Sequence, residues 1–269
     1  MSQPFPDVFE QQVVYLAAKR TMLRMQSDRI DTLVLGSSHG DFGFDPAYVP
    51  GSFNACCRSQ DLKHSFRLYE AFAQRYDTIH TVVMFYSVFS SGWILERSRA
   101  EGPISVALNE VFCLGMNYHD PHLAELNACV EGKLDEISVD VPGRSGFLPE
   151  FNKGFMPANL TTEKRVSDHM RFYNSSVAVE YLDDLLELAG RNGHRVIVVT
   201  PPVRSDFRRI AGENLFGAVR NRLGQHRAKL LDLYRSELFA DEDFGDMDHL
   251  RPLGSGVSTL SSLVWESIR

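Results

Sequence analysis

The sequence has few cysteines, and their spacing forms no recognisable framework. The four cysteines lie at positions 56, 57, 113 and 129, without Cys-x-x-Cys spacing. A disulfide scaffold would need a higher density of cysteine in a shorter chain. Adjacent strand residues point to opposite faces, so Cys56 and Cys57 are poorly placed to share a metal ion. We expect buried thiols in a reducing compartment.

Long apolar runs and a basic surplus are also missing. No run of 18 apolar residues occurs, so we expect no membrane-spanning helix. Pro4, Pro6 and Asp7 precede any apolar stretch, which is the wrong order for a secretory signal peptide. The formal net charge is -7, which disfavours nucleic acid or an anionic membrane as partner. These absences together predict a soluble, cytoplasmic protein.

Motifs for nucleotides, phosphates and metals are absent as well. The sequence contains no Gly-x-Gly-x-x-Gly and no Gly-Lys-Ser/Thr, the loops that bind nucleotide phosphates. It also lacks the Asn-His-Glu motif of metallophosphatases. Residues 119–122 read His-Asp-Pro-His, but no further spaced ligands accompany them. We therefore expect no cofactor and no bound metal, and a phosphate-handling enzyme is the least supported class.

Apolar strands alternate with amphipathic helices along the chain. Strands are expected over 32–35, 51–55, 79–86, 195–200 and 230–234, and helices over 7–27, 62–76, 104–114, 121–129, 173–191, 207–223 and 253–268. This alternation predicts an α/β domain with a mostly parallel sheet covered on both faces. We expect one domain over 1–269, in which the Pro- and Gly-interrupted segment 90–165 is an insertion or lid.

A turn of small residues follows the first expected strand. Positions 36–39 read Gly-Ser-Ser-His directly after the apolar run 31–35. Open α/β sheets bind their ligands at the carboxyl ends of the strands, and Gly36 lets the chain leave the strand sharply. Ser37 or Ser38 would then lie near backbone N–H groups able to stabilise an oxyanion. A Gly-Ser turn after a strand is common, so this motif alone indicates little.

A second motif, Asp246-x-x-His249, lies far downstream, just before the last expected helix. The aspartate can accept a hydrogen bond from one ring nitrogen while the other nitrogen faces a serine, as a general base requires. Residues 250–256 form a firm turn that would hold His249 in place. We expect Asp246 rather than Asp248 to orient the ring, because adjacent side chains rarely face one another.

Taken in their order along the chain, these two motifs resemble the first and last sequence blocks of the SGNH, or GDSL-like, hydrolase superfamily. The likeness is to its bacterial branch linked to surface polysaccharides and acyl transfer. The resemblance implies a three-layer flavodoxin-like fold and acyl-ester chemistry. It assigns Ser38 as nucleophile, His249 as base and Asp246 as its orienting partner. It also implies an O-acetylated carbohydrate or a small ester as substrate.

The chain departs from this family at the oxyanion donors. The family's second-block glycine and its Gly-x-Asn-Asp third block have no counterpart. A backbone N–H of Cys57, Arg58 or Ser59 could serve as a donor beside the N–H of Ser38. In place of the third block, Ser87 could donate, or the oxyanion hole is incomplete. Loss of one donor typically lowers the rate by about 10²–10³. This departure leaves open a second class, a non-catalytic binding or assembly protein of polysaccharide biosynthesis.

Two further side chains are candidates for substrate binding. His39 lies beside Ser38, and Arg204 follows the expected strand 195–200. Arg204 would suit an anionic group of a small-molecule or glycan ester substrate. Both residue types are also typical of solvent-exposed positions without a function.

Overall fold

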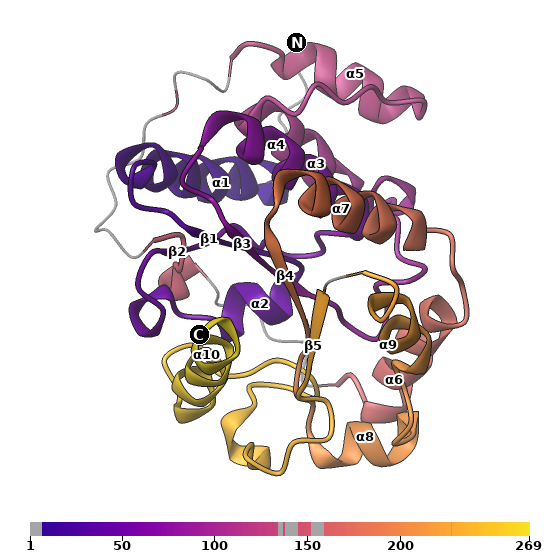
Figure 1. Ribbon diagram of the computed structural model, residues 1–269. Coiled ribbons are helices and arrows are strands. Elements are labelled where there is room, and N and C mark those ends of the chain that lie inside the picture. The colour runs from indigo at the N-terminus through magenta and orange to yellow at the C-terminus, as the bar shows by residue number, and fades with distance from the viewer. Residues whose placement is uncertain (1–6, 134–136, 138–144, 152–158, 227) are drawn as a thin grey trace.

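A parallel sheet of five strands forms the centre of the computed structural model, which describes all residues except 1–6, 134–136, 138–144, 152–158 and 227 (Figure 1). The strands are β1 (Thr32–Leu35), β2 (Ser52–Asn54), β3 (Thr81–Phe85), β4 (Arg195–Thr200) and β5 (Ala228–Asp232). Their order is β2-β1-β3-β4-β5, and every neighbouring pair is parallel. This is the flavodoxin-like order, so the predicted α/β fold class is confirmed.

Helices connect the strands throughout the described part of the chain. The α-helices are α1 (Asp7–Gln26), α2 (Ser38–Gly43), α3 (Leu62–Arg75), α4 (Gly102–Phe112), α5 (Pro121–Val130), α6 (Thr162–Tyr173), α7 (Val179–Asn192), α8 (Ser205–Ala211), α9 (Gly217–Leu223) and α10 (Ser255–Ile268). The short 3-10 helices are η1 (Pro46–Tyr48), η2 (Leu95–Arg97), η3 (Pro149–Phe151) and η4 (Asp241–Asp243). None of the described helices has the length and apolar character needed to cross a membrane.

Helices cover both faces of the sheet, which gives three layers (Figure 1). Successive side chains of a strand point to opposite faces. On one face, Leu33 and Val82 belong to a large core with α1, α3, α4 and α7. On the other face, Val34 and Val83 pack in a second core with α10. The strands β1, β2 and β3 are buried along their whole length, as is usual for parallel strands between two layers.

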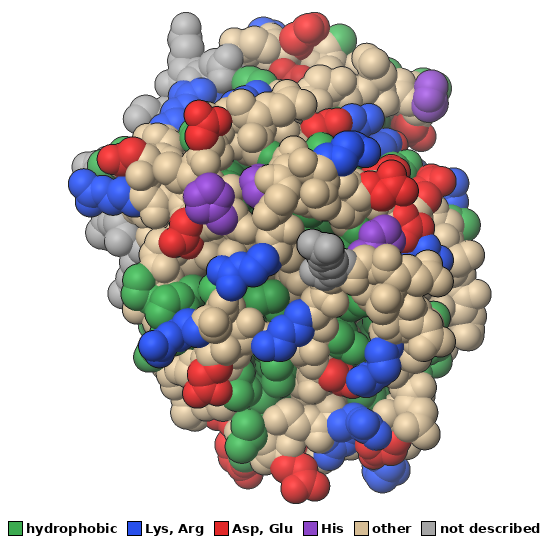
Figure 2. Space-filling view, viewed as in Figure 1, with side chains coloured by type: hydrophobic (Ala, Val, Ile, Leu, Met, Phe, Trp, Pro, Cys, Tyr) green, Lys and Arg blue, Asp and Glu red, His purple; other side chains and the backbone are tan. Residues whose placement is uncertain are grey.

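One edge of the sheet, formed by β5, faces outward. Its residues are only partly buried, and Lys229 is exposed. Figure 2 shows Lys and Arg side chains among hydrophobic ones on the face in front of β5 and α10. Lysine on an edge strand discourages pairing with a strand of another molecule.

The segment 90–165, expected as an insertion or lid, mostly extends the helical layer. Its helix α4 packs against α1 and α5, on the face of the sheet that α1 covers. The end of the segment enters α6, which packs against α8 and whose Arg165 contacts Asp248. Parts of the expected lid, residues 134–136, 138–144 and 152–158, lie outside the described residues.

Of the helices expected from the sequence, one begins later in the structure and one is divided. The helix expected over 173–191 begins only at Val179, and a separate helix, α6, precedes it. The helix expected over 207–223 is broken into α8 and α9 at Gly212, whose φ of 103° is incompatible with an α-helix. The other expected elements agree with the structure within a few residues.

Candidate active site

The carboxyl ends of β1 and β3 meet where the strand order reverses. β1 pairs with β2 on one side and with β3 on the other, and the chain runs from β1 to an outer strand before it returns. Open α/β sheets bind ligands at such a switch point. Ser38 follows β1 and Ser87 follows β3. The serine motif therefore lies at the position that the fold favours for a ligand site.

Two glycines allow α2 to lie directly on β3. Gly36 has a φ of 138°, and a Cβ there would lie 2.7 Å from the Cβ of Phe85. A Cβ on Gly40 would lie 2.6 Å from the Sγ of Cys56 and 2.7 Å from the ring of Phe85. Side chains at either glycine would push α2 away from the sheet. Ser38 is the first residue of this helix and is half-buried.

A buried ion pair beneath α2 connects it to α1. The ammonium group of Lys19 lies 2.7 Å from the Oδ1 of Asp41, and both side chains are fully enclosed. The hydroxyl of Tyr15 donates to the same carboxylate oxygen. Lys19 also donates to the carbonyl oxygens of Asn54 and Cys56. Burial raises the pKa of Asp41, although Lys19 and Tyr15 oppose the shift. α1 thus fixes α2 relative to β2.

The Asp-x-x-His motif lies on a loop closed by backbone hydrogen bonds. Phe244 and Leu250 form an isolated antiparallel bridge across its base. The backbone N–H of Arg204 donates to the carbonyl of Met247, 3.1 Å away. These contacts hold the loop against the end of β4, which is why its side chains keep a defined direction.

Ser38, His249 and Asp246 form one chain of hydrogen bonds. The Oγ of Ser38 lies 2.8 Å from the Nε2 of His249, and the Nδ1 of His249 lies 2.9 Å from the Oδ2 of Asp246. The Oδ1 of Asp246 accepts from the backbone N–H groups of His249 and Asp248, at 2.8 and 3.0 Å. His249 is 2 % exposed. The structure therefore brings the three residues of the sequence prediction together.

The charge on Asp246 determines which ring nitrogen of His249 carries the proton. Burial by itself raises the pKa of Asp246, but the hydrogen bond and charge of His249 outweigh burial and leave that pKa lowered. An ionised carboxylate only accepts hydrogen bonds, so the Nδ1 of His249 is the donor. The Nε2 is then free to accept from the hydroxyl of Ser38. This is the arrangement of a nucleophile and its general base.

A second carboxylate, that of Asp248, lies behind the ring of His249. Arg165 of α6 donates to both of its oxygens, with Nε to Oδ1 at 3.0 Å and Nη2 to Oδ2 at 2.9 Å. The Oδ2 is also 3.1 Å from the Nε2 of His39 and 3.5 Å from that of His169. Burial raises the pKa of Asp248, but the charge of Arg165 and the histidines together hold it well below its usual value.

His39 bridges Asp248 and the serines at the ends of β1 and β3. Its Nδ1 lies 2.9 Å from the Oγ of Ser87 and 3.3 Å from the Oγ of Ser37. Burial lowers the pKa of His39 although the hydrogen bond to Asp248 opposes the shift, and burial lowers that of His169 to about 3. Both rings are therefore neutral near pH 7, and the Nε2–H of His39 donates to the ionised Asp248.

Two residues expected to face a substrate are turned inward. Ser87, expected as an oxyanion donor, is fully buried, and its hydroxyl bonds to His39 and, at 3.2 Å, to Ser37. Its backbone N–H donates to the Oγ of Ser90 at 2.9 Å. His39, expected as a substrate contact, is 5 % exposed. Through their hydrogen bonds, both residues hold neighbouring groups of the site in position rather than face a substrate.

The two arginines predicted near the site form ion pairs of their own. The side chain of Arg58 is 53 % exposed and lies 3.0 Å from Glu101. The guanidinium of Arg204 donates to both carboxylate oxygens of Asp206. Arg204 contributes to the site through its backbone bond to the Asp-x-x-His loop, whereas its role in anion binding stays a prediction.

Sequence reasoning missed α6 and with it Arg165 and His169. Thr161 is the N-cap of this helix, and Glu163 lies in its first turn, which is a recognised signal for a helix start. That signal would have located the helix. Nothing local predicts the pairing of Arg165 with Asp248, because the two lie 83 positions apart in the sequence.

The cluster behind the ring contains metal-ligating residue types. His39, Asp248 and His249 offer ligand atoms that all lie within 4.8 Å of one another. However, the guanidinium of Arg165 already occupies both oxygens of Asp248, and a second cation on that carboxylate would meet its positive charge. We assign no metal site to this cluster.

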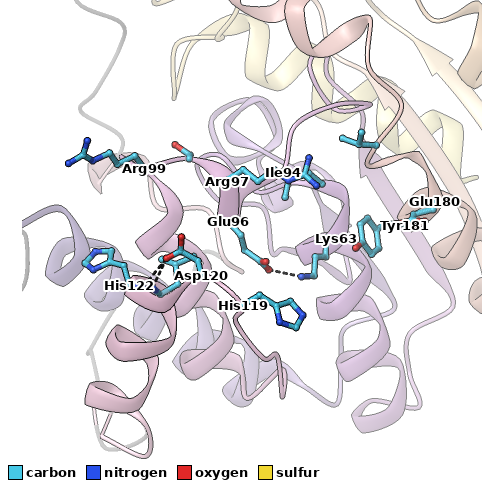
Figure 3. Close-up of a pocket in the computed structure, with 13 residues that line it drawn as sticks. Lys63, Ile94, Glu96, Arg97, Arg99, His119, Asp120, His122, Glu180 and Tyr181 are labelled. Carbon is cyan, nitrogen blue, oxygen red and sulfur yellow. Dashed lines mark hydrogen bonds and ion pairs between the residues drawn. The ribbon is translucent and has the colours of Figure 1, made fainter.

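A pocket of about 990 Å³ opens elsewhere, between η2 and the N-terminal ends of α3, α5 and α7 (Figure 3). Charged side chains line much of it, and an ion pair of Lys63 and Glu96, 2.6 Å long, crosses it. Its lining residues include none of Ser38, Asp246 and His249. The pocket is separate from the hydrogen-bonded site.

Comparison with known proteins leaves the site to be interpreted from its geometry. No protein-family model matches this chain, and no curated protein matches it either.

Proposed function

We propose that this chain is a serine-dependent acyl-ester hydrolase or O-acyltransferase. The observation that carries the proposal is the hydrogen-bond chain from Ser38 through His249 to Asp246, with distances of 2.8 and 2.9 Å. A serine with a correctly oriented imidazole beside it is a nucleophile with its base. The position at the switch point of the sheet supports the same reading.

In the proposed reaction, His249 first removes the proton of Ser38 while Oγ attacks the ester carbonyl. The tetrahedral intermediate then collapses, and the alcohol departs with the proton from Nε2 of His249. Ser38 now carries the acyl group as an ester. Water, or a hydroxyl of an acceptor, loses a proton to His249 and attacks this ester. The acid or the transferred ester leaves, and Ser38 regains its proton.

The oxyanion is proposed to bind to backbone N–H groups of two turns. The N–H of Ser38 lies in the first turn of α2, where a helix has no acceptor for it. The turn 57–60 is fixed beside it, because the N–H of Cys57 donates to the carbonyl of Gly36 at 3.1 Å. Ser59 in this turn has a positive φ of 59°. We propose the N–H of Arg58 as the second donor. Ser87 does not donate to the oxyanion in this proposal, because its hydroxyl is hydrogen-bonded to His39.

The proposed substrate is an O-acylated, in particular O-acetylated, carbohydrate. This choice rests on the resemblance of positions 36–38 and 246–249 to the polysaccharide-associated branch of the SGNH hydrolases. A carbohydrate hydroxyl as acceptor would give transfer, and water would give hydrolysis.

A second candidate is a binding or assembly protein that keeps the fold without turnover. The inward orientation of Ser87 favours it, since the hydroxyl bonds to His39 and Ser37 rather than facing a substrate. Without a third donor the oxyanion would be bound less strongly, and the loss of one donor typically lowers the rate by about 10²–10³.

Labelling with a fluorophosphonate, followed by mapping of the adduct with mass spectrometry, separates the two candidates. We expect an adduct on Ser38 that is lost in Ser38→Ala and in His249→Ala. Ser37→Ala is the matched control, because it removes the neighbouring hydroxyl of the same turn and should keep the adduct. Absence of an adduct in wild-type protein with a native circular dichroism spectrum would favour the binding protein.

A further inference from the structure

We propose that Arg165 of α6 sets the basicity of His249 by neutralising the carboxylate of Asp248. Arg165 acts through Asp248 and is therefore a positioning residue, not a catalytic one. The inference rests on the proposed role of His249 as general base. It extends that role by making α6, a helix distant in sequence from both motifs, a determinant of the pH at which the base works.

The ring of His249 faces two carboxylates rather than one. Its Nδ1 is 2.9 Å from the Oδ2 of Asp246 and 3.6 Å from the Oδ1 of Asp248. Each negative charge at such a distance favours the protonated ring. A second unopposed carboxylate would therefore favour the protonated ring, and a protonated imidazole cannot accept the proton of Ser38.

Arg165 neutralises the negative charge of Asp248. It binds both oxygens of Asp248, at 3.0 and 2.9 Å, in the bidentate geometry that suits a guanidinium and a carboxylate. The side chain of Asp248 is 0 % exposed and that of Arg165 16 %, so water and salt screen the pair weakly. The pair is neutral as a whole, and the ring of His249 then responds mainly to Asp246.

The other titratable groups around the ring do not supply this compensation. The groups that face His249 are Asp246 and Asp248 from its own loop, Ser38, His39 and Asp41 from α2, and Arg165 and His169 from α6. His39 and His169 are neutral because burial lowers their pKa. Asp41 has its own cation, Lys19. Within this set, Arg165 is the cation that opposes Asp248.

Titration of His249 by NMR, in protein with isotope-labelled histidine, tests the inference directly. Removing the cation in Arg165→Gln should raise the pKa of His249 by about 1–3 units. Asp248→Asn should lower that pKa, since Arg165 is then unopposed. The double variant, Arg165→Gln with Asp248→Asn, should return near wild type, and Arg165→Lys should stay near it because the charge is kept. The signal of His249 is assigned by its loss in His249→Gln.

Arg220 offers a matched control. It forms an ion pair with Asp232, 2.8 Å long, that does not involve the Asp-x-x-His loop. Arg220→Gln should leave the titration of His249 unchanged. A merely structural role of Arg165 would lower the melting temperature of Arg165→Gln without moving the pKa of His249. An equal pKa of His249 in Arg165→Gln and wild type, with or without a lowered melting temperature, would overturn the inference.

The pH dependence of fluorophosphonate labelling separates this inference from the proposed function. In Arg165→Gln the acidic limb of the labelling rate should move to higher pH by the shift seen in the NMR titration. If wild type is never labelled, the proposed function fails, while the NMR titration still tests Arg165. If wild type is labelled but the acidic limb of the labelling rate lies at the same pH in Arg165→Gln as in wild type, the inference alone fails.

Discussion

The imidazole rings of His39 and His249 are stacked, with centroids 4.7 Å apart and planes inclined by 28°. His39 is itself held at both nitrogens, by Ser87 at 2.9 Å and Asp248 at 3.1 Å. A ring fixed in this way limits the rotation of its neighbour. Because burial lowers the pKa of His39 and keeps it neutral, the stack adds no like charge when His249 takes up a proton.

The tautomer of His249 should depend on the carboxylate of Asp246. In Asp246→Asn, the side-chain amide can donate to Nδ1 and drive the proton to Nε2, which then cannot accept from Ser38. We expect the second-order rate constant of fluorophosphonate labelling to fall by about 10⁴, as in other triads with this change. Asp232→Asn, at the end of β5, serves as control. An unchanged rate in Asp246→Asn would remove this residue from the mechanism.

The close approach of α2 to β3 should make Gly40 intolerant of a side chain. A Cβ there would lie within 2.7 Å of Cys56 and Phe85, so Gly40→Ala should lower the free energy of unfolding by about 1–3 kcal/mol. Gly43→Ala is the matched control in the same helix, since its Cβ would meet the nearest side-chain atoms at 3.5 Å and beyond. Urea unfolding measures both. Equal losses in the two variants would contradict the packing argument.

Removing one partner of the Lys19–Asp41 ion pair should lower the free energy of unfolding far more than replacing both partners together. Lys19→Met leaves a buried carboxylate without its cation, so we expect a loss of about 3–5 kcal/mol in the free energy of unfolding. Lys19→Met with Asp41→Asn should recover part of that loss, because no charge remains. Urea unfolding of the single and double variants gives the coupling. Additive losses would show that the two residues do not interact.

His169 should make the protein less stable as pH falls from about 6.5. The unfolded chain binds a proton near the ordinary histidine pKa of about 6.5, whereas folded His169 does so only near pH 3. Between these values the unfolded state holds more protons, so stability falls with falling pH by up to about 1.4 kcal/mol per unit. Above pH 6.5 this contribution is constant.

His169→Phe tests this dependence, because it keeps the ring that packs on Phe89 and Phe207. The loss of unfolding free energy between pH 7.5 and 5.0 should be smaller than in wild type by about 2 kcal/mol. Urea unfolding at the two pH values provides the comparison. If both proteins lose the same amount, His169 is not the acid-sensitive group.

The strands and the three central residues of the site could be predicted because their signals are local. Residues 195–200 are β-branched and apolar, and they form β4. Asp246 and His249 are three positions apart, so one turn brings the carboxylate to the ring. Parallel strands bring their carboxyl ends to one edge of the sheet, which explains how Ser38 could be placed near them from sequence.

The surroundings of the site could not be predicted because they depend on contacts distant in sequence. His39 has the pattern of an exposed residue at a helix start, yet Asp248, 209 positions away, binds it in the interior. Adjacent side chains rarely face one another, but Asp248 still reaches the ring of His249 at 3.6 Å. The break before α7 is likewise set by tertiary contact, since the N–H of Ala178 donates to the carbonyl of Ser91.

The two adjacent cysteines beyond β2 make the opening of the turn 36–38 measurable with native thiols, without an engineered cysteine. Cys56 and Cys57 are 0 % exposed, and burial raises the pKa of both thiols. The expectation of buried thiols is wrong for Cys113 and Cys129, which are exposed. A thiol reagent should modify the exposed pair in the native protein and the buried pair only during an opening event. Because the N–H of Cys57 is bonded to the carbonyl of Gly36, the slow phase of modification reports how often the backbone beside Ser38 separates from its neighbour.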